Sequence, residues 1–237
     1  MGVAKVFNFM ALTKSQIFQL LKSDAFDQNV TTVMALPRRR ALRVLFSAIC
    51  GSDALVKWRS VMMLGRLTAT MADEDIEQAR IIMRRLMWYL TEESGSIGWG
   101  ASEALAAAMV CHEQLAREFA KILVSYLRED GNLLEFEPLQ QGVLWGLGEL
   151  AEARPNLLKD IEISTLLPEF LQSPDAGVRG LTARVAGLLQ CTEHVERLKE
   201  ITADSTALRV YQHPWLIDIT VGAMASDAVQ RIGIKVL

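Results

Sequence analysis

The chain contains an internal repeat, and this repeat limits the possible folds more than any other feature of the sequence. Segments with the same order of residue sizes begin at Val56, Ile97, Leu139 and Val178, at offsets of 41, 42 and 39 residues. Apolar or small residues stand at positions 0, 4, 7, 8 and 11 of each segment, which is the spacing of one face of an α-helix. A helix that recurs at this interval predicts an α-solenoid whose units stack around a continuous core.

Each segment also carries a pair of small or aliphatic residues at a fixed register. The pairs are Leu64-Gly65, Leu105-Ala106, Leu147-Gly148 and Ala186-Gly187. Glycine inside a helix costs about 0.5–1 kcal/mol relative to alanine, so its recurrence at one register indicates a compensating gain in packing. We expect the helices of neighbouring repeats to approach closely at these positions.

The repeat resembles the HEAT repeat, an armadillo-type α-solenoid unit whose second helix typically follows an Asp and a short turn with Val-Arg and a later Leu-Gly pair. The segment Ser173-Pro174-Asp175-Ala176-Gly177-Val178-Arg179 matches this pattern most closely, and Ser52-Asp53-Ala54-Leu55-Val56-Lys57 comes second. The segments around Ile97 and Leu139 depart from it, because Gly98 and Gln140 replace the basic residue. The resemblance implies an all-α fold, a right-handed superhelix of HEAT-like helical hairpins.

The predicted domain is a single solenoid over residues 1–237, with N-terminal capping helices in 1–35, four repeats in 36–190 and a C-terminal cap in 191–237. The first helices of the first three repeats are expected at Pro37–Ile49, Asp75–Leu90 and Glu113–Leu127. Pro155 and Pro168 should break the fourth, over Pro155–Leu171, into short pieces. Asp175 is expected to cap the last repeated helix.

The C-terminal cap contains one segment that does not follow the helical spacing. Apolar and polar residues alternate with period two along Leu208–Tyr211 and Ile217–Val221, on either side of Gln212-His213-Pro214-Trp215. This alternation predicts a small β-hairpin within 207–221. Such a hairpin would either cover the end of the solenoid or offer an edge to a partner strand.

Nine side chains of the repeated helices lie off the predicted buried face, and we expect them to be exposed on the inner surface of the solenoid. This inner strip consists of Trp58, Arg59, Met62, Arg66, Trp99, Glu103, Trp145, Glu149 and Arg184. Tryptophan and arginine are the residue types that most often dominate binding interfaces. We therefore predict that the inner strip binds a partner protein; alternatively, the tryptophans fill gaps between adjacent helices.

Net charge, apolar run length and cysteine spacing exclude several classes of function. With 25 basic and 28 acidic residues, the chain has a net charge of −3, which disfavours general binding to nucleic acid. Its longest apolar run, Ala104–Cys111, is too short to span a membrane, and no export signal is recognised at the N-terminus. Cys50, Cys111 and Cys191 are too far apart for a metal knuckle or a dense disulfide framework, which favours the cytoplasm.

No catalytic constellation, metal-ligand motif or phosphate loop is found, so no catalytic residue, metal or cofactor is assigned. The sequence thus predicts a non-catalytic scaffold or adaptor that binds a partner protein along its concave surface. The alternatives come from other HEAT-like proteins: a subunit of an enzyme such as a bilin lyase, or a DNA glycosylase. A further HEAT-repeat family, the di-iron deoxyhypusine hydroxylases, uses repeated His-Glu pairs as iron ligands. This chain contains one such pair, His112-Glu113, which is too few for that ligand set.

Overall fold

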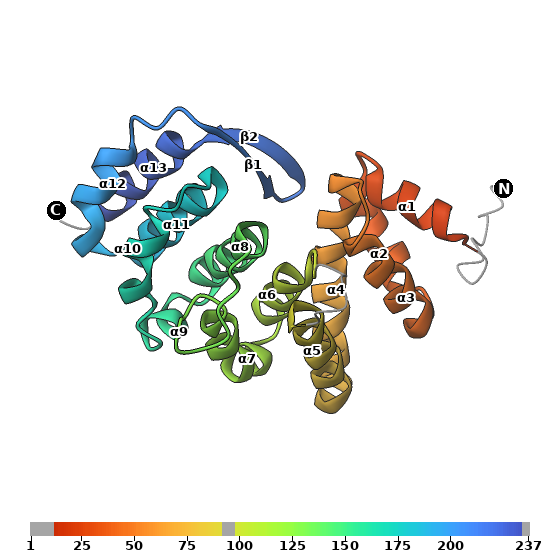
Figure 1. Cartoon of the computed structure of the whole chain (residues 1–237). Helices are drawn as coiled ribbons and strands as arrows, with labels where there is room; N and C mark the ends of the chain where they lie inside the picture. The colour runs from red at the N-terminus through yellow and green to blue at the C-terminus, as the bar shows by residue number, and fades with distance from the viewer. Residues whose placement is uncertain (1–11, 92–97, 234–237) are drawn as a thin grey trace.

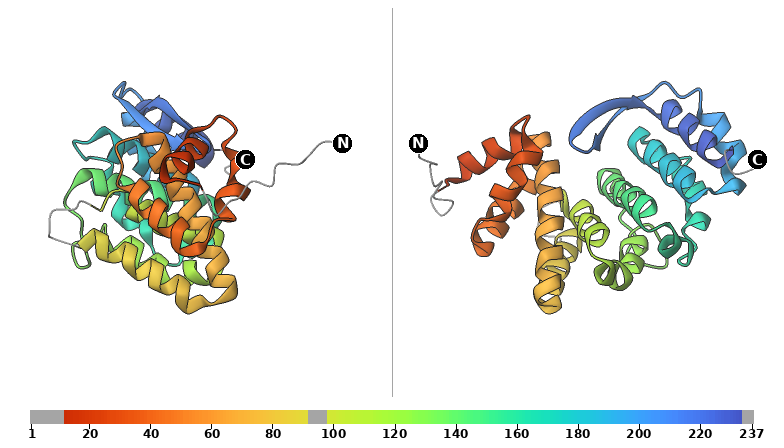
Figure 2. Two further views of the ribbon diagram at one scale, coloured as in Figure 1. Left: turned by 90° about the vertical axis from the view of Figure 1, so that its right-hand side faces the viewer. Right: turned by 180° about the vertical axis from the view of Figure 1, so that it is seen from behind.

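A computed structural model describes residues 12–91 and 98–233, which form two layers of helices and one β-hairpin. Ile97, the first residue of the second repeated segment, lies outside the described residues, as do residues 1–11 of the predicted N-terminal cap and 234–237 of the predicted C-terminal cap. Figures 1 and 2 show the helices arranged in a curved row, with the hairpin crossing its inner side.

The inner layer contains the repeated helices of the sequence pattern. It consists of α4 (Ala54–Glu74), α6 (Ala101–Cys111), α8 (Glu137–Ala153), α11 (Ala176–Leu189) and α13 (Val221–Gly233). Each of these helices packs against the next one in the row. Asp175 caps α11 as predicted, by accepting the amide proton of Val178, and Asp53 caps α4 in the same way through Val56.

The outer layer follows the predicted first helices. It consists of α3 (Arg38–Ile49), α5 (Ile76–Thr91), α7 (Glu113–Ser125), the pieces α9 (Pro155–Lys159), η2 (Ile163–Leu166) and α10 (Leu167–Phe170), and then η3 (Thr192–His194) and α12 (Val195–Ile201). The expected break between Pro155 and Leu171 is therefore confirmed. At the N-terminal end, α1 (Lys14–Lys22) and α2 (Phe26–Met34) pack on α4.

The small residues at the repeated register bring neighbouring inner helices close together. A Cβ atom added to Gly65 would lie 2.6 Å from the Cβ of Ala107 on α6, and one added to Gly187 would lie 2.5 Å from the Cα of Ala228 on α13. Real Cβ atoms do not approach this closely, so a glycine is required at both positions. The packing role predicted for the repeated glycines is confirmed at these two contacts.

The predicted hairpin is confirmed as well. Strands β1 (Ala207–Gln212) and β2 (Trp215–Thr220) pair antiparallel, from Ala207 opposite Thr220 to Gln212 opposite Trp215. The hairpin lies between α12 and α13, and its two ends meet where the amide of Val221 donates to the carbonyl of Thr206 at 3.1 Å. The hairpin is thus an insertion in the connection between the last two helices.

Within the described residues, no helix has both the length and the apolar character needed to cross a bilayer.

Candidate functional site

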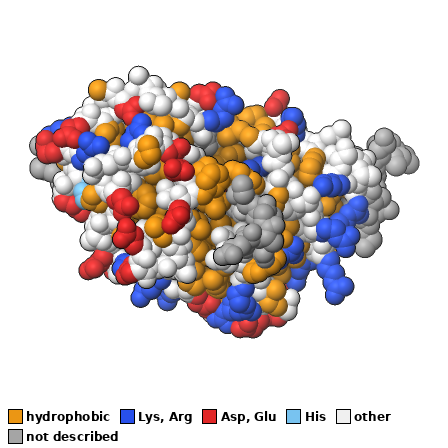
Figure 3. All heavy atoms as spheres, viewed as in Figure 1, with side chains coloured by type: hydrophobic (Ala, Val, Ile, Leu, Met, Phe, Trp, Pro, Cys, Tyr) orange, Lys and Arg blue, Asp and Glu red, His pale blue; other side chains and the backbone are white. Residues whose placement is uncertain are grey.

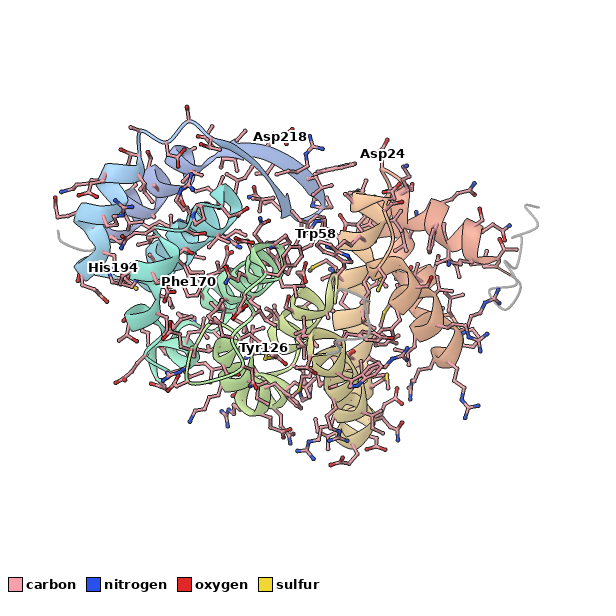
Figure 4. The ribbon with its side chains drawn as sticks, in the orientation of Figure 1. Asp24, Trp58, Tyr126, Phe170, His194 and Asp218 are labelled. Atoms are coloured by element: carbon pink, nitrogen blue, oxygen red, sulfur yellow. The ribbon has the colours of Figure 1, made fainter. Side chains whose placement is uncertain are left out.

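The hairpin reaches along the inner side of the solenoid from the C-terminal helices to the N-terminal ones (Figure 1). Its turn, residues 211–215, is called the hairpin tip below. The tip contacts a surface formed by Phe26 of α2, Trp58 and Arg59 of α4, and Trp145 of α8, which we call the tip site. Figure 4 shows Trp58 where the end of the hairpin meets α4, whereas Asp218 lies on the opposite, outer side of the strands.

Arg59 is the central residue of the tip site. Its Nη1 donates to the carbonyls of Leu21 (2.8 Å), in the last turn of α1, and Ser23 (2.7 Å), the residue that follows α1. Its Nε and Nη2 donate to the carbonyl of Pro214 in the hairpin tip, at 3.2 and 3.1 Å. The planar guanidinium can make these bonds in two directions at once, so one side chain joins the hairpin to the N-terminal helices.

The environment of Arg59 explains how a cation is tolerated there. The side chain is fully buried, and this desolvation lowers the pKa of Arg59 from its ordinary value. The guanidinium carbon lies 4.7 Å from the ring centre of Phe26 and 4.8 Å from that of Trp215. Backbone carbonyls and aromatic faces thus surround the charge, and the carboxylates of Asp27 and Asp24 favour it from beyond ion-pair distance.

Three aromatic rings meet beside Arg59. Trp58 stacks on Tyr211 of the tip, with ring centres 5.3 Å apart and an interplanar angle of 3°, and its other neighbour is Trp145 at 4.6 Å. The Nε1 of Trp145 donates to the backbone carbonyl of Tyr211 at 3.0 Å. Burial raises the pKa of the Tyr211 hydroxyl to about 12, so it stays protonated at neutral pH.

The outermost contact of the tip is polar and accessible to solvent. His213 Nε2 lies 3.1 Å from Oδ1 of Asp27 on α2, and His213 Nδ1 lies 3.2 Å from the Tyr211 hydroxyl. Exposed pairs of this kind contribute little to stability because water screens them. The tip is therefore held mainly by Arg59 and the aromatic cluster.

These contacts correct part of the sequence prediction. The expected exposure of Arg59, Glu103 and Trp145 is wrong, because all three side chains are buried. The hairpin covers Arg59 and Trp145, whereas Glu103 is enclosed between α6 and the neighbouring helices. The helical register correctly directs Arg59 and Trp145 inward, but register alone cannot reveal that another segment covers them.

Glu103 lies in a small pocket beside the hairpin, which we call the Trp99 pocket. The carboxylate accepts a hydrogen bond from Ser102 Oγ at 3.0 Å and lies 3.6 Å from the ammonium of Lys57. The same ammonium lies 5.7 Å from the ring centre of Trp58 and 5.4 Å from that of Trp99. The pocket has a volume of about 180 Å³ and is bounded on the hairpin side by β1.

A larger cavity of about 460 Å³, called the Arg184 cavity below, lies between the hairpin and helices α8, α11 and α13. Its charged rim includes Arg184, which pairs with Glu149 at 2.8 Å and Glu152 at 3.1 Å. Its apolar lining includes Leu188 and Ile217. A cavity with this lining can accept an apolar side chain and orient a polar group at its edge.

The remaining inner-strip residues stay accessible. Trp58, Met62, Arg66, Trp99, Glu149 and Arg184 are half-buried. Trp99 packs edge-on against Phe136, whose side chain is 44% exposed, with ring centres 6.0 Å apart. Figure 3 shows apolar side chains gathered in the middle of the visible face, with charged ones to both sides. The structure therefore divides the nine residues into six that are accessible and three that are buried.

The residues that complete the tip site were not predicted as site residues from the sequence. Tyr211, His213 and Trp215 were predicted only as part of a hairpin, Asp27 only as part of a capping helix, and Phe26 only as lying within the capping region 1–35. A concentration of aromatic residues around a single turn, Tyr211-Gln212-His213-Pro214-Trp215, was the signal that could have indicated a docked tip.

The described residues contain no cluster of three or more His, Cys, Asp or Glu side chains that could hold a metal ion. The three cysteines are free thiols, and burial raises the pKa of Cys191 to about 12. A thiol with so high a pKa is a poor nucleophile.

No model of a known protein family matches the sequence, and a search of curated proteins gave no match either. Solved structures do resemble the fold. A designed armadillo repeat protein in complex with the peptide (KR)4 aligns with a TM-score of 0.53 at 14% identity, over 93% of this chain and 100% of its own.

Two further structures align at similar levels. A computationally designed armadillo repeat protein for modular peptide recognition has a TM-score of 0.51 at 13% identity, over 92% of this chain and 99% of its own. An engineered protein has a TM-score of 0.52 at 16% identity, over 93% of this chain and 96% of its own. These likenesses confirm the HEAT/armadillo-like solenoid predicted from the repeat, and they concern the fold alone.

Proposed function

We propose that this protein is a non-catalytic, cytosolic scaffold that binds a segment of a partner protein on the inner side of its solenoid. The observation that carries the proposal is that this side already binds an extended polypeptide, the chain's own hairpin. The bonds from Arg59 to the Pro214 carbonyl and from Trp145 to the Tyr211 carbonyl are made to backbone atoms. Helices that recognise backbone in this way are suited to peptide binding.

The accessible part of the inner strip gives the partner its contacts. Trp99 and Phe136 offer an aromatic surface on one side of the hairpin, and Arg66 lies more than two turns further along α4 than Lys57. Because Arg66 is half-buried and its guanidinium makes no hydrogen bond or ion pair with the described residues, its donors are available to a partner. The peptide complex of the designed armadillo repeat protein supports this use of the fold.

The test is an affinity pull-down from an extract of the native cells, comparing the wild type with a Trp99→Ala, Arg66→Ala variant. We expect the wild type to retain a stoichiometric protein that the variant loses, with affinity reduced at least about 30-fold for the purified pair. Circular dichroism should show an unchanged fold.

The matched control is a Trp88→Ala, Arg84→Ala variant. These two residues lie on the outer helix α5, with Trp88 55% exposed and Arg84 in only a distant pair with Glu77 at 3.8 Å. The control removes the same side chains from the opposite layer and should retain the partner. Equal loss of the partner from both variants, or from neither, would reject the inner surface as the binding site.

A further inference from the structure

The hairpin is fastened at its two ends, and between them its inner face packs on the solenoid beside two cavities. Its tip is bound by Arg59 and the aromatic cluster, and its base is held by the Val221 amide and by Asp204, which pairs with Arg179 at 2.6 Å. Between these points Val210 borders both the Trp99 pocket and the Arg184 cavity. Arg209 and Asp218 form an exposed ion pair on the outer face of the strands. The strands therefore behave as a strap across the inner surface.

The tip site has the composition of a binding hot spot. Trp145 is buried in contact with Tyr211, and Arg59 is sealed between Phe26 and Trp215. If the tip moved away, two tryptophans, a phenylalanine and an arginine with free donors would be uncovered together. Clustered tryptophan and arginine side chains at the centre of a surface are characteristic of the residues that dominate protein–protein binding.

The contacts also define what the tip site recognises. Arg59 and Trp145 bind carbonyl oxygens, which any peptide supplies, while Trp58 and Arg59 accept the aromatic rings of Tyr211 and Trp215. The matching ligand is a turn with an aromatic residue on each side, four positions apart, and carbonyls directed at the two donors.

We propose that the hairpin is an internal ligand of the tip site, and that a partner segment with the same chemistry, a turn flanked by two aromatic residues, binds there by displacing the hairpin tip. This inference rests on the proposed scaffold role, because it assigns the partner class and the regulation of the same inner surface. While the tip is bound, the apparent affinity for the partner segment is reduced by the fraction of molecules in which the tip site is open.

The test uses a labelled synthetic peptide of residues 207–220 and the full chain carrying Tyr211→Ala and Trp215→Ala. These substitutions remove both aromatic rings from the tip but leave every residue of the tip site in place. We expect the peptide to bind this variant at least tenfold more tightly than it binds the wild type. A peptide with the same two substitutions should not bind, and adding Arg59→Lys to the protein variant should abolish binding of the unmodified peptide.

Hydrogen exchange of the wild-type chain provides a second, independent measurement. If the strap opens by itself, the amides of residues 207–220 should exchange at least 100-fold faster than the amides of α6 and α8. Exchange of both groups at one rate would mean that the hairpin opens only when the whole chain unfolds, which would overturn the proposal. If the double variant fails to fold, the single Trp215→Ala variant replaces it, since Trp215 is 42% exposed.

The outcomes separate this inference from the proposed function. Equal peptide binding to wild type and variant, or no binding to a variant whose hairpin amides exchange freely, would reject the tip site. Peptide binding to the variant together with an unchanged pull-down for Trp99→Ala, Arg66→Ala would uphold the tip site and reject the accessible strip. Loss of the partner from the Trp99→Ala, Arg66→Ala variant, together with no peptide binding to the tip variant, would uphold the accessible strip and reject the tip site.

Discussion

The stacked inner helices and the hairpin are attached to the same solenoid by different kinds of contact. The helices meet through close backbone approach, as at Gly65 and Ala107, along a continuous apolar core. The hairpin is attached by a few directional bonds centred on Arg59, where residue 214 contacts a helix 155 positions earlier in the sequence. Stability in the stack is thus distributed over many contacts, whereas the attachment of the hairpin depends on a few.

This contrast predicts the largest effect for a bulky residue in the stack. Gly65→Val should reduce the free energy of unfolding by about 3 kcal/mol, because α4 and α6 must separate to admit the side chain. Urea unfolding followed by circular dichroism measures the loss. Gly233→Ala is the control: a Cβ there would meet nothing within 4 Å, so its stability should be unchanged or slightly raised. Similar losses in the two variants would contradict close packing as the cause.

A conservative change at Arg59 should act more locally. Arg59→Lys keeps the charge but removes the planar guanidinium that hydrogen-bonds three carbonyls. We therefore expect the free energy of unfolding to fall by about 2 kcal/mol. Hydrogen exchange should increase in residues 207–220 and remain almost unchanged in α8. Arg43→Lys, at an exposed position of α3, should change neither quantity. Equal acceleration in hairpin and helix would show that the two regions are not separable.

The Trp145 hydrogen bond tests the hairpin's attachment more finely. Trp145→Phe retains an aromatic ring but leaves the Tyr211 carbonyl without its donor, and should cost about 1 kcal/mol of unfolding free energy. The near-ultraviolet circular dichroism of the stacked aromatic rings should change as well. Trp88→Phe, on the exposed outer helix, should leave stability unaffected.

The smallest expected effect is on pH dependence at the base of the hairpin. Hydrogen bonds from Thr206, followed by the Arg179 guanidinium, lower the pKa of Asp204 to about 2, below the ordinary aspartate value of about 3.9. Because the folded pKa is the lower one, this contribution is complete above about pH 5 and is lost as the pH falls toward 2.

Solvent screening limits the contribution of the ionised Asp204 carboxylate to the free energy of unfolding to about 1 kcal/mol. The difference in unfolding free energy between the wild type and Asp204→Asn should therefore shrink as the pH is lowered from about 5 to about 2.5. A constant difference over this range would mean that Asp204 does not stabilise the base through its charge.

The repeat was sufficient to predict the solenoid because helical spacing and glycine register are local properties. The break at Pro155 and Pro168 and the caps at Asp53 and Asp175 follow from the same local rules. Alternation with period two likewise predicted the hairpin.

The location of the hairpin tip could not be predicted in this way. It depends on the curvature of the whole row, which accumulates from small rotations between many helices and brings residue 59 near residue 214. Arg59 shows the consequence: its register indicates an inward-facing arginine, and only the docked tip makes it a buried one. Whether the accessible residues around Trp99 bind a partner stays a prediction.

The hydrogen bond between Val221 and Thr206 has a consequence for how such a chain can change. Because the two ends of the hairpin are already in contact there, we expect that residues 207–220 could be lengthened, shortened or replaced by another sequence without a shift of α12 or α13. Natural variation and design could both exploit this junction. The same helices could carry a different insert in place of the fourteen residues 207–220. The tip site would then hold a different internal ligand, while the helical framework stayed unchanged.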